Sequence, residues 1–359
     1  MCHDRLACFV AAAAMLVTTA AVARPFFDPR AEKNDAIDAD AALAAAPRDA
    51  ACSTARLVAT GGAAPHDAHT LAVRWAGFSN FELAYNGKVI LLDAYYDRGG
   101  NYPSLGFAAA DVKRADLMII GHGHFDHMSD AASVGIQTGA SIVGAPLTTD
   151  KLASQKVPAA QLRTVTGKGS ERLGFDGFTV EPILARHGQP DPRVTTAIEG
   201  ALSSLGEPNP ALEAEERPIR ARGVSDPRVI TEGTIAYLIT LDDGFRIMYR
   251  DSGGRVTAEE KAAMARAGGV DLALVAVAGD YLSTLTTRQA LEHIRTYRPT
   301  VYMPAHHDGS FTGGRAMSRA TEPLFQAVKD DNPEIVTVSR SYREPVCFNT
   351  EFNLARGGR

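Results

Sequence analysis

The sequence has no excess of basic residues, no long strongly apolar run and no internal repeat, and each absence narrows the possible function. Its 37 Lys and Arg residues are outnumbered by 42 Asp and Glu residues, which gives a net charge of −5. Such a chain presents no basic field to a polyanion, so we expect no nucleic-acid partner. What remains is ordinary globular composition, 45% hydrophobic over 359 residues, with ample length for a large core.

The apolar segment at the amino terminus has the pattern of an export signal. Residues 6–22 are rich in Ala, Val and Leu and follow Arg5, and the tripeptide AVA at 21–23 has small residues where a signal peptidase cleaves. The run is short and Ala-rich for a membrane span, which needs roughly 20 strongly apolar residues. We therefore expect residues 1–23 to be a signal peptide, with export to the periplasm or beyond and no stable membrane insertion. An uncleaved anchor is the alternative.

Cleavage after residue 23 would leave two cysteines, Cys52 and Cys347, since Cys2 and Cys8 lie within the signal. Two cysteines in an exported protein can form one disulfide. This bond would tie the start of the mature chain to its end and stabilise the fold by about 2–5 kcal/mol. The alternative is a pair of buried free thiols.

The rest of the chain is expected to comprise an irregular leader, residues 24–68, and one domain, residues 69–350. The leader is rich in Ala, Asp and Pro and has no sustained strand pattern. In the domain, two sets of short strands are each followed by helices. The expected strands are 71–75, 81–85, 88–93, 117–120, 141–143, 161–165, 178–184, 234–241, 246–249, 272–277 and 301–303, and the expected helices are 109–114, 126–136, 258–267, 286–298 and 315–329.

Three connections between these elements can be predicted. Asn-Gly at 86–87 and Asp-Gly at 243–244 are typical two-residue hairpin turns. Strands 161–165 and 178–184 are expected to pair across a polar turn. Residues 189–231 interrupt the regular pattern with prolines and charges, which indicates an insertion. It would serve as a lid over a site or form a surface excursion.

The most informative segment is GHGHFDH at residues 121–127, directly after a predicted buried strand. Three imidazoles and a carboxylate within six residues would be costly to bury without a shared cation, to which each offers a lone pair. Alternate spacing puts His122 and His124 on one side of an extended loop, while Asp126 and His127 turn toward a second position. Gly121 and Gly123 are expected to supply backbone freedom. A His-rich surface loop is the alternative.

Three further candidate ligands, His187, Asp251 and His306, follow later predicted strands. Each one alone would be an ordinary polar residue at a strand end. Their repetition at successive strand ends, together with the first motif, predicts that they converge on it. His307 is the alternative to His306, and His293, in the middle of a predicted helix, is expected to be structural.

This succession, HxHxDH followed by His, Asp and His after later strands, resembles the metallo-β-lactamase superfamily over roughly residues 70–345. The resemblance implies a four-layer αβ/βα sandwich of two mixed β-sheets flanked by helices. It also implies a first metal on His122, His124 and His187, a second metal on Asp126, His127 and His306, and Asp251 bridging both. Asp93 corresponds to an early structural Asp of that family, or it is a simple turn carboxylate.

The segment WAG at residues 75–77 resembles the branch of ascorbate-phosphate lactonases and N-acyl-phosphatidylethanolamine phospholipases D. That branch usually has His after the Gly, where this chain has Phe78. It also tends to have Gly before the bridging Asp, where this chain has Arg250. Arg250 would either anchor an anionic substrate or support Asp251.

The implied chemistry is hydrolysis by a hydroxide that two divalent cations activate. The hydroxide would attack a small ester, lactone, amide or phosphodiester, with Asp126 orienting it and relaying its proton. The imidazole-rich ligand set favours zinc, with manganese or iron as alternatives. The expected partner is therefore a small-molecule substrate. Two other functions stay open: an iron-dependent thiol or persulfide oxygenase on the same fold, and a non-catalytic exported metal-binding protein.

Overall fold

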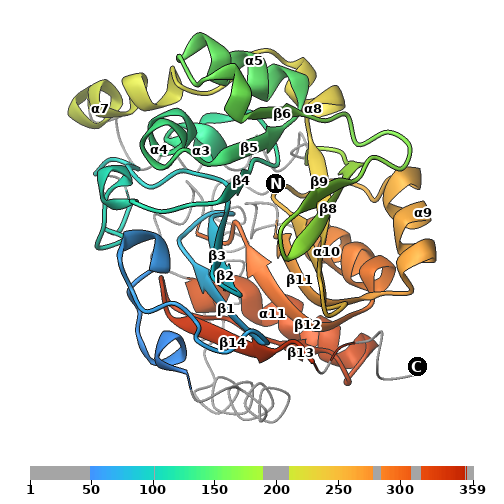
Figure 1. The fold of residues 1–359 in the computed structure, drawn as a ribbon. Coiled ribbons are helices and arrows are strands. Elements are labelled where there is room, and N and C mark those ends of the chain that lie inside the picture. The colour runs from blue at the N-terminus through green and yellow to red at the C-terminus, as the bar shows by residue number, and fades with distance from the viewer. Residues whose placement is uncertain are drawn as a thin grey trace, which may run out of the picture.

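The computed structural model describes residues 49–100, 102–188, 210–277, 284–308, 317–351 and 353. Over these residues the chain forms two seven-stranded sheets that face each other, with helices on their outer sides (Figure 1). The predicted signal peptide and residues 24–48 of the leader lie outside the described residues.

The first sheet has the strand order β14-β1-β2-β3-β4-β5-β6. Neighbouring strands are antiparallel from β14 to β3 and parallel from β3 to β6. Its strands are β1 (Thr70–Trp75), β2 (Phe81–Tyr85), β3 (Lys88–Leu92), β4 (Leu117–Ile119), β5 (Ser141–Gly144), β6 (Leu162–Thr164) and β14 (Pro345–Asn349).

The second sheet has the order β13-β12-β11-β10-β9-β8-β7 and repeats this division. Its strands are antiparallel from β7 to β10 and parallel from β10 to β13. They are β7 (Leu173–Phe175), β8 (Phe178–Leu184), β9 (Ile235–Leu241), β10 (Arg246–Arg250), β11 (Val270–Ala276), β12 (Pro299–Ala305) and β13 (Val336–Thr337).

Helices connect the parallel strands and cover the sheets. They are α3 (Phe125–Met128), α4 (Ala131–Thr138), α5 (Pro146–Ser154), α7 (Pro210–Arg220), α8 (Arg228–Glu232), α9 (Ala258–Ala267), α10 (Thr284–Tyr297) and α11 (Met317–Asp331), with short 3-10 turns η1 (Ala50–Ser53), η2 (Val58–Thr60), η3 (Ala109–Asp111) and η4 (Ala159–Gln161). α9 begins at a capping box of Thr257 and Glu260. Among the helices described, none has the length and apolar character needed to cross a bilayer.

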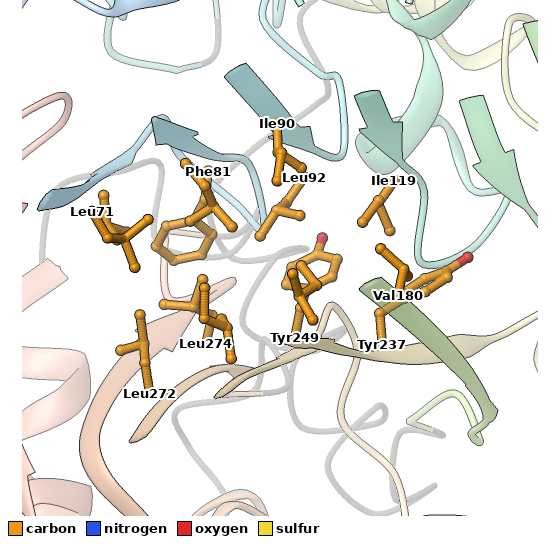
Figure 2. Packing of buried hydrophobic residues seen from close by; sticks show 14 of the residues in the cluster. Leu71, Phe81, Ile90, Leu92, Ile119, Val180, Tyr237, Tyr249, Leu272 and Leu274 are labelled. Carbon is orange, nitrogen blue, oxygen red and sulfur yellow. The ribbon is translucent and has the colours of Figure 1, made fainter. Parts of the chain in front are cut away.

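The two sheets divide the buried hydrophobic residues into three cores, because successive side chains of a strand point to opposite faces of its sheet. In β1, Leu71, Val73 and Trp75 enter the core between the sheets, whereas Ala72 faces the helices of the first sheet. Figure 2 shows the central core, where side chains such as Phe81 of the first sheet meet those of the second. A third core lies between the second sheet and α9, α10 and α11. Three cores between four layers confirm the predicted αβ/βα sandwich.

The predicted pairing of residues 161–165 with residues 178–184 is wrong, because these strands belong to different sheets. β6 lies parallel to β5, and β8 pairs with β7 across a tight turn at Gly177, whose φ is +91°. β7 has only three residues, one of them Gly174, so it carries too little alternation to be predicted from its sequence.

The helix predicted over residues 126–136 is divided into α3 and α4. Asp130, at the division, accepts hydrogen bonds from the backbone N–H groups of Tyr96 (2.7 Å) and Asp97 (2.9 Å). This side chain fastens the end of α3 to the loop that follows β3. The division therefore serves the placement of α3, whose first residues belong to the GHGHFDH segment.

The described part of the leader, residues 49–68, is irregular but packed against the first sheet. A fully buried ion pair joins Arg74 of β1 to Glu82 of β2 at 3.0 Å. The Glu82 carboxylate also accepts hydrogen bonds from the backbone N–H groups of Val58 (3.0 Å) and Ala59 (2.7 Å). The leader thus satisfies a carboxylate that would otherwise be buried with a single partner.

A disulfide joins Cys52 in η1 to Cys347 in β14, as the cysteine count had suggested, in place of two free thiols. It fastens the leader to the edge strand of the first sheet. The two cysteines are 295 positions apart in the sequence, so the bond closes most of the chain into one loop.

Replacing both Cys52 and Cys347 with Ser is expected to lower the free energy of unfolding by about 2–5 kcal/mol, because the unfolded chain regains the entropy that the closed loop removes. Denaturant titrations of the oxidised wild type and the double variant measure the difference. A reducing agent should bring the wild type to the value of the variant and leave the variant unchanged. Equal stability of the two oxidised proteins would contradict this.

His293 in α10 is fully buried, stacks on Tyr297 and donates a hydrogen bond from Nε2 to the carbonyl oxygen of Gly254 (2.8 Å). Burial, aided by the positive charge of Arg250, lowers the pKa of His293 to about 3 from 6.5. The side chain is therefore neutral in the folded protein at all pH values well above 3, as suits a structural residue.

The lowered pKa of His293 predicts loss of stability in acid. Below pH 6.5 the unfolded chain binds a proton here that the folded chain refuses until about pH 3. The free energy of unfolding should fall by up to about 1.4 kcal/mol per pH unit in this window because of this one group. Denaturant titrations at pH 7.5 and pH 5 should show a smaller loss for His293→Gln than for the wild type. An equal loss in both proteins would show that His293 does not contribute.

Candidate metal centre

The seven predicted ligands lie after the carboxyl ends of strands from both sheets, in the connecting loops or in the short helix α3. His122 follows β4 of the first sheet, while Asp251 and His306 follow β10 and β12 of the second. His187 follows β8, which runs in the same direction as β10 because both are antiparallel to β9. Strands that end at the same edge deliver these side chains to one place.

The side chains form three overlapping groups, and within each group the candidate ligand atoms lie within 4.8 Å of one another. The first group is His122, His124 and His187; the middle group is His122, His127 and Asp251; the third group is Asp126, His127 and His306. The middle group shares one histidine with each of the others. The structure therefore brings together all seven residues predicted from the sequence.

In the first group, three imidazoles face one another. His122 Nε2 lies 2.9 Å from His124 Nδ1, and the His187 ring centroid is 4.7 Å from that of His122 and 4.8 Å from that of His124. Burial, reinforced by the neighbouring histidines, lowers the pKa of His122 well below its usual value and that of His187 to about 4. Neutral imidazoles offer lone pairs, which is the form that a metal binds.

The third group combines two imidazoles with a carboxylate. Asp126 Oδ2 lies 3.2 Å from His306 Nε2 and 3.6 Å from His127 Nε2. Although burial opposes ionisation, His127 and His306 lower the pKa of Asp126 well below its usual value. Asp126 therefore offers an anionic oxygen to a cation at neutral pH.

Asp251 lies in the middle group and is fully buried. Its Oδ2 is 2.6 Å from His122 Nδ1 and 3.3 Å from His127 Nδ1. Its Oδ1 has no hydrogen-bond partner among the residues described. A buried carboxylate oxygen without a partner is costly, and a cation would satisfy it.

Gly121 leaves room for this carboxylate. A Cβ atom at Gly121 would lie 2.1 Å from the Cγ and Oδ2 atoms of Asp251. Likewise, a Cβ atom at Gly123 would lie 2.7 Å from Val224. Neither glycine has a positive φ. The expected role of the two glycines, backbone freedom, is thus wrong, and what the loop requires of them is the absence of a side chain.

Asp93 has the structural role that the resemblance implied, because both of its carboxylate oxygens accept hydrogen bonds from the GHGHFDH segment. Its Oδ1 accepts a hydrogen bond from the backbone N–H of Gly121 (2.9 Å), and its Oδ2 accepts one from His127 Nδ1 (2.6 Å). The second bond turns His127 Nε2 toward Asp126 and fixes the orientation of the ring. Asp93 itself adopts a positive φ of +56°, so its placement costs backbone strain.

The charges around His127 indicate that a cation fits here. Burial alone would lower the pKa of His127, but the negative charges of Asp126, Asp93 and Asp251 raise it to about 10. Three carboxylates thus draw a positive charge to this point. A divalent cation bound by the surrounding nitrogens and oxygens would supply that charge, and such mixed His and Asp donors suit zinc and similar metals.

Two open alternatives from the sequence are decided by packing. Arg250 is fully buried, pairs with Glu260 at 2.8 Å and donates to the carbonyl oxygen of Arg186, so it does not reach a substrate. His307 is buried and stacks on Trp75 with a centroid distance of 4.1 Å. His306, rather than His307, belongs to the third group.

Residues 72–306 match the profile of the β-lactamase superfamily domain, and this match covers more than half of the chain. The chain belongs to this superfamily. Membership accords with the observed sandwich and with the position of the seven residues at its strand ends.

Several relatives within the superfamily are named as hydrolases. A UPF0173 metal-dependent hydrolase of Pyrobaculum islandicum is 30% identical over 141 residues, or 38% of this chain and 60% of that protein. Another, of Nitratidesulfovibrio vulgaris, is 27% identical over 235 residues, or 65% and 79%. The chain spans between 51% and 60% of the length of the first curated relatives it matches.

A solved structure of similar fold is Igni18, a metallo hydrolase of Ignicoccus hospitalis. It has a TM-score of 0.54 and 20% sequence identity, and the match covers 78% of this chain and 98% of that one. This likeness supports the fold of the present superfamily member.

The predicted insertion, residues 189–231, is described from residue 210 onward. This part packs against the GHGHFDH segment. The backbone N–H of Val224 donates to the carbonyl oxygen of Gly123 (2.7 Å). Arg222 pairs with Asp130 at 3.0 Å. These two charged residues support the loop without touching the candidate ligands, and no motif in the sequence had marked them.

Replacing Asp93 with Asn is expected to weaken metal binding by roughly 10–100-fold, because His127 loses the acceptor that orients its ring. Metal affinity is measured by competition with a chromogenic chelator. Asp116→Asn is the matched control, since Asp116 also accepts a backbone hydrogen bond, from Val89 (2.8 Å), but lies just before β4, whereas Asp93 lies just after β3. Equal metal affinity of the Asp93 variant and the wild type would rule out the orienting role.

Proposed function

We propose that this chain is a metal-dependent hydrolase that holds two cations at the overlapping groups. The observation that carries the proposal is the grouping of Asp251 with one histidine from each outer group, as expected of a carboxylate that bridges two cations. The metal-dependent hydrolase names of its relatives support the same function. One cation is held by His122, His124 and His187 and the other by Asp126, His127 and His306.

When bound, two cations would lower the pKa of a bound water toward about 7 and polarise the oxygen of the bond under attack. Asp126 is the residue suited to the proton of that water. His127 and His306 keep its carboxylate ionised, and its side chain is partly open to solvent, at 18% exposure. Asp126 can therefore orient the water and accept its proton.

The solvent exposure of the candidate ligands indicates the side from which a substrate can reach the site. His122, His127 and Asp251 are buried and form the floor of the site. The partly exposed residues are His124, Asp126, His187 and His306. Each outer group thus has a side that a small ester, lactone, amide or phosphodiester can reach.

We take the cations to be zinc, on account of the five histidines among the donors. A thiol or persulfide oxygenase would instead hold a single iron and consume oxygen. A non-catalytic metal-binding protein would hold its metal without turnover. The proposed setting is the periplasm or the exterior, and the proposed partner is a small-molecule substrate.

A metal count on the purified protein, combined with a panel of ester, lactone, amide and phosphodiester substrates, tests the proposal. We expect two zinc ions per chain, turnover of at least one substrate class, loss of turnover after chelation and recovery with added zinc. One iron per chain with oxygen uptake would replace the proposal with oxygenation. Two metals without any turnover would favour the non-catalytic function.

His122→Ala and Asp251→Ala are expected to lower metal occupancy and turnover together, by more than the roughly 10–100-fold that an outer residue costs. His122 belongs to the first and the middle group, and Asp251 belongs to the middle group, which shares a histidine with each outer group, so the loss of either residue is expected to affect both cations. His66→Ala is the control, because the His66 side chain is 83% exposed. Full metal occupancy and activity in either site variant would show that the site lies elsewhere.

A further inference from the structure

His306 is held in an unfavourable backbone conformation, and so is the residue it contacts. The φ of His306 is +57° and that of Phe78 is +48°, in the left-handed region that side chains other than Gly rarely adopt. The backbone N–H of His306 donates to the carbonyl oxygen of Phe78 (2.7 Å), and the two rings meet edge to face at 4.9 Å. Two strained backbone conformations, far apart in the sequence, are therefore joined by a hydrogen bond and a ring contact. Further contacts must offset the free-energy cost of the strain.

Asp308 supplies that support. Its Oδ1 accepts a hydrogen bond from the backbone N–H of Phe78 (2.7 Å). Its Oδ2 accepts bonds from the guanidinium of Arg98 (3.0 Å) and from the hydroxyl of Tyr342. Asp308 is fully buried and Arg98 is 3% exposed, so water does not compete for these bonds.

The turn at Gly77 is shaped around this ion pair. The φ of Gly77 is +81°, and a Cβ atom there would lie 2.4 Å from Arg98 Nη1 and 3.1 Å from Asp308 Oδ2. The Arg98 guanidinium also lies over the Tyr342 ring, 4.9 Å from its centroid. The Arg98–Asp308 pair is thus enclosed by the same turn whose next residue, Phe78, binds His306.

We propose that Asp308 is a positioning residue for His306. Asp308 holds the N–H of Phe78, Phe78 presents its carbonyl oxygen to the N–H of His306, and the imidazole of His306 is thereby set against Asp126. This inference rests on the proposed metal site and adds a residue that touches neither a candidate cation nor the substrate. It assigns the Arg98–Asp308 pair to the third group alone, with no role in the first.

The test is a metal titration of Asp308→Asn by calorimetry or chelator competition, alongside the wild type. Binding of the second cation should weaken by roughly 10–100-fold, while the first, held by His122, His124 and His187, keeps its affinity. Glu82→Gln is the matched control, because Arg74–Glu82 is an equally buried pair with the same 3.0 Å separation. It should lower stability and leave both affinities unchanged. Tyr342→Phe, which removes one donor to Asp308, gives a milder change of the same kind if Asp308→Asn does not fold.

A double variant that combines Asp308→Asn with His306→Ala tests the positioning role of Asp308 independently of the proposed function. If Asp308 acts through His306, Asp308→Asn has no further effect on metal affinity once His306 is Ala. An undiminished effect in that background, or loss of stability alone with both affinities intact, would overturn the positioning role. A wild type that binds one cation, with an affinity that His306→Ala and Asp308→Asn lower alike, would overturn the two-metal function and keep the positioning role.

Discussion

The site depends on one constraint, which is that carboxylates and imidazoles buried together must share positive charge. Asp93 and Asp251 are fully buried, and burial raises the pKa of both carboxyl groups. Their closest ionic partners are histidines, and His127 is drawn toward protonation by three carboxylates at once. Ionised groups out of water are costly unless their charge is neutralised. A bound cation would meet this requirement, so residues that would destabilise an ordinary core form a candidate metal centre.

The sandwich makes this clustering possible because its two sheets end their strands at the same edge. Loops after β4, β8, β10 and β12 deliver donors from positions far apart in the chain. Behind the donors lies a layer of residues that fix their orientation. Asp93 orients His127, the missing side chain of Gly121 leaves space for Asp251, and Asp308 steadies the turn that carries His306. These contacts fix the orientation of donors that lie on loops.

Local patterns in the sequence were sufficient wherever a property depends on neighbouring residues. The hairpins at Asn86 and Asp243 and the long alternating strands were found because turn chemistry and alternation are local. The pairing of β6 could not be found in this way, since a three-residue strand carries no signal of its partner. Arg250 was equally undecided, because its partner Glu260 is not marked as such by any motif.

The sequence alone identified the seven candidate ligands, because GHGHFDH is a local motif and the later His and Asp residues stand at the ends of strands that alternation predicts. It also limited the cysteines to one pair. Only the tertiary structure decided that Asp251 joins the two outer groups, that His306 and not His307 faces Asp126, and that the glycines of the loop are needed for space. These are relations between residues distant in the chain, and they are fixed by how the two sheets pack, which no local pattern encodes.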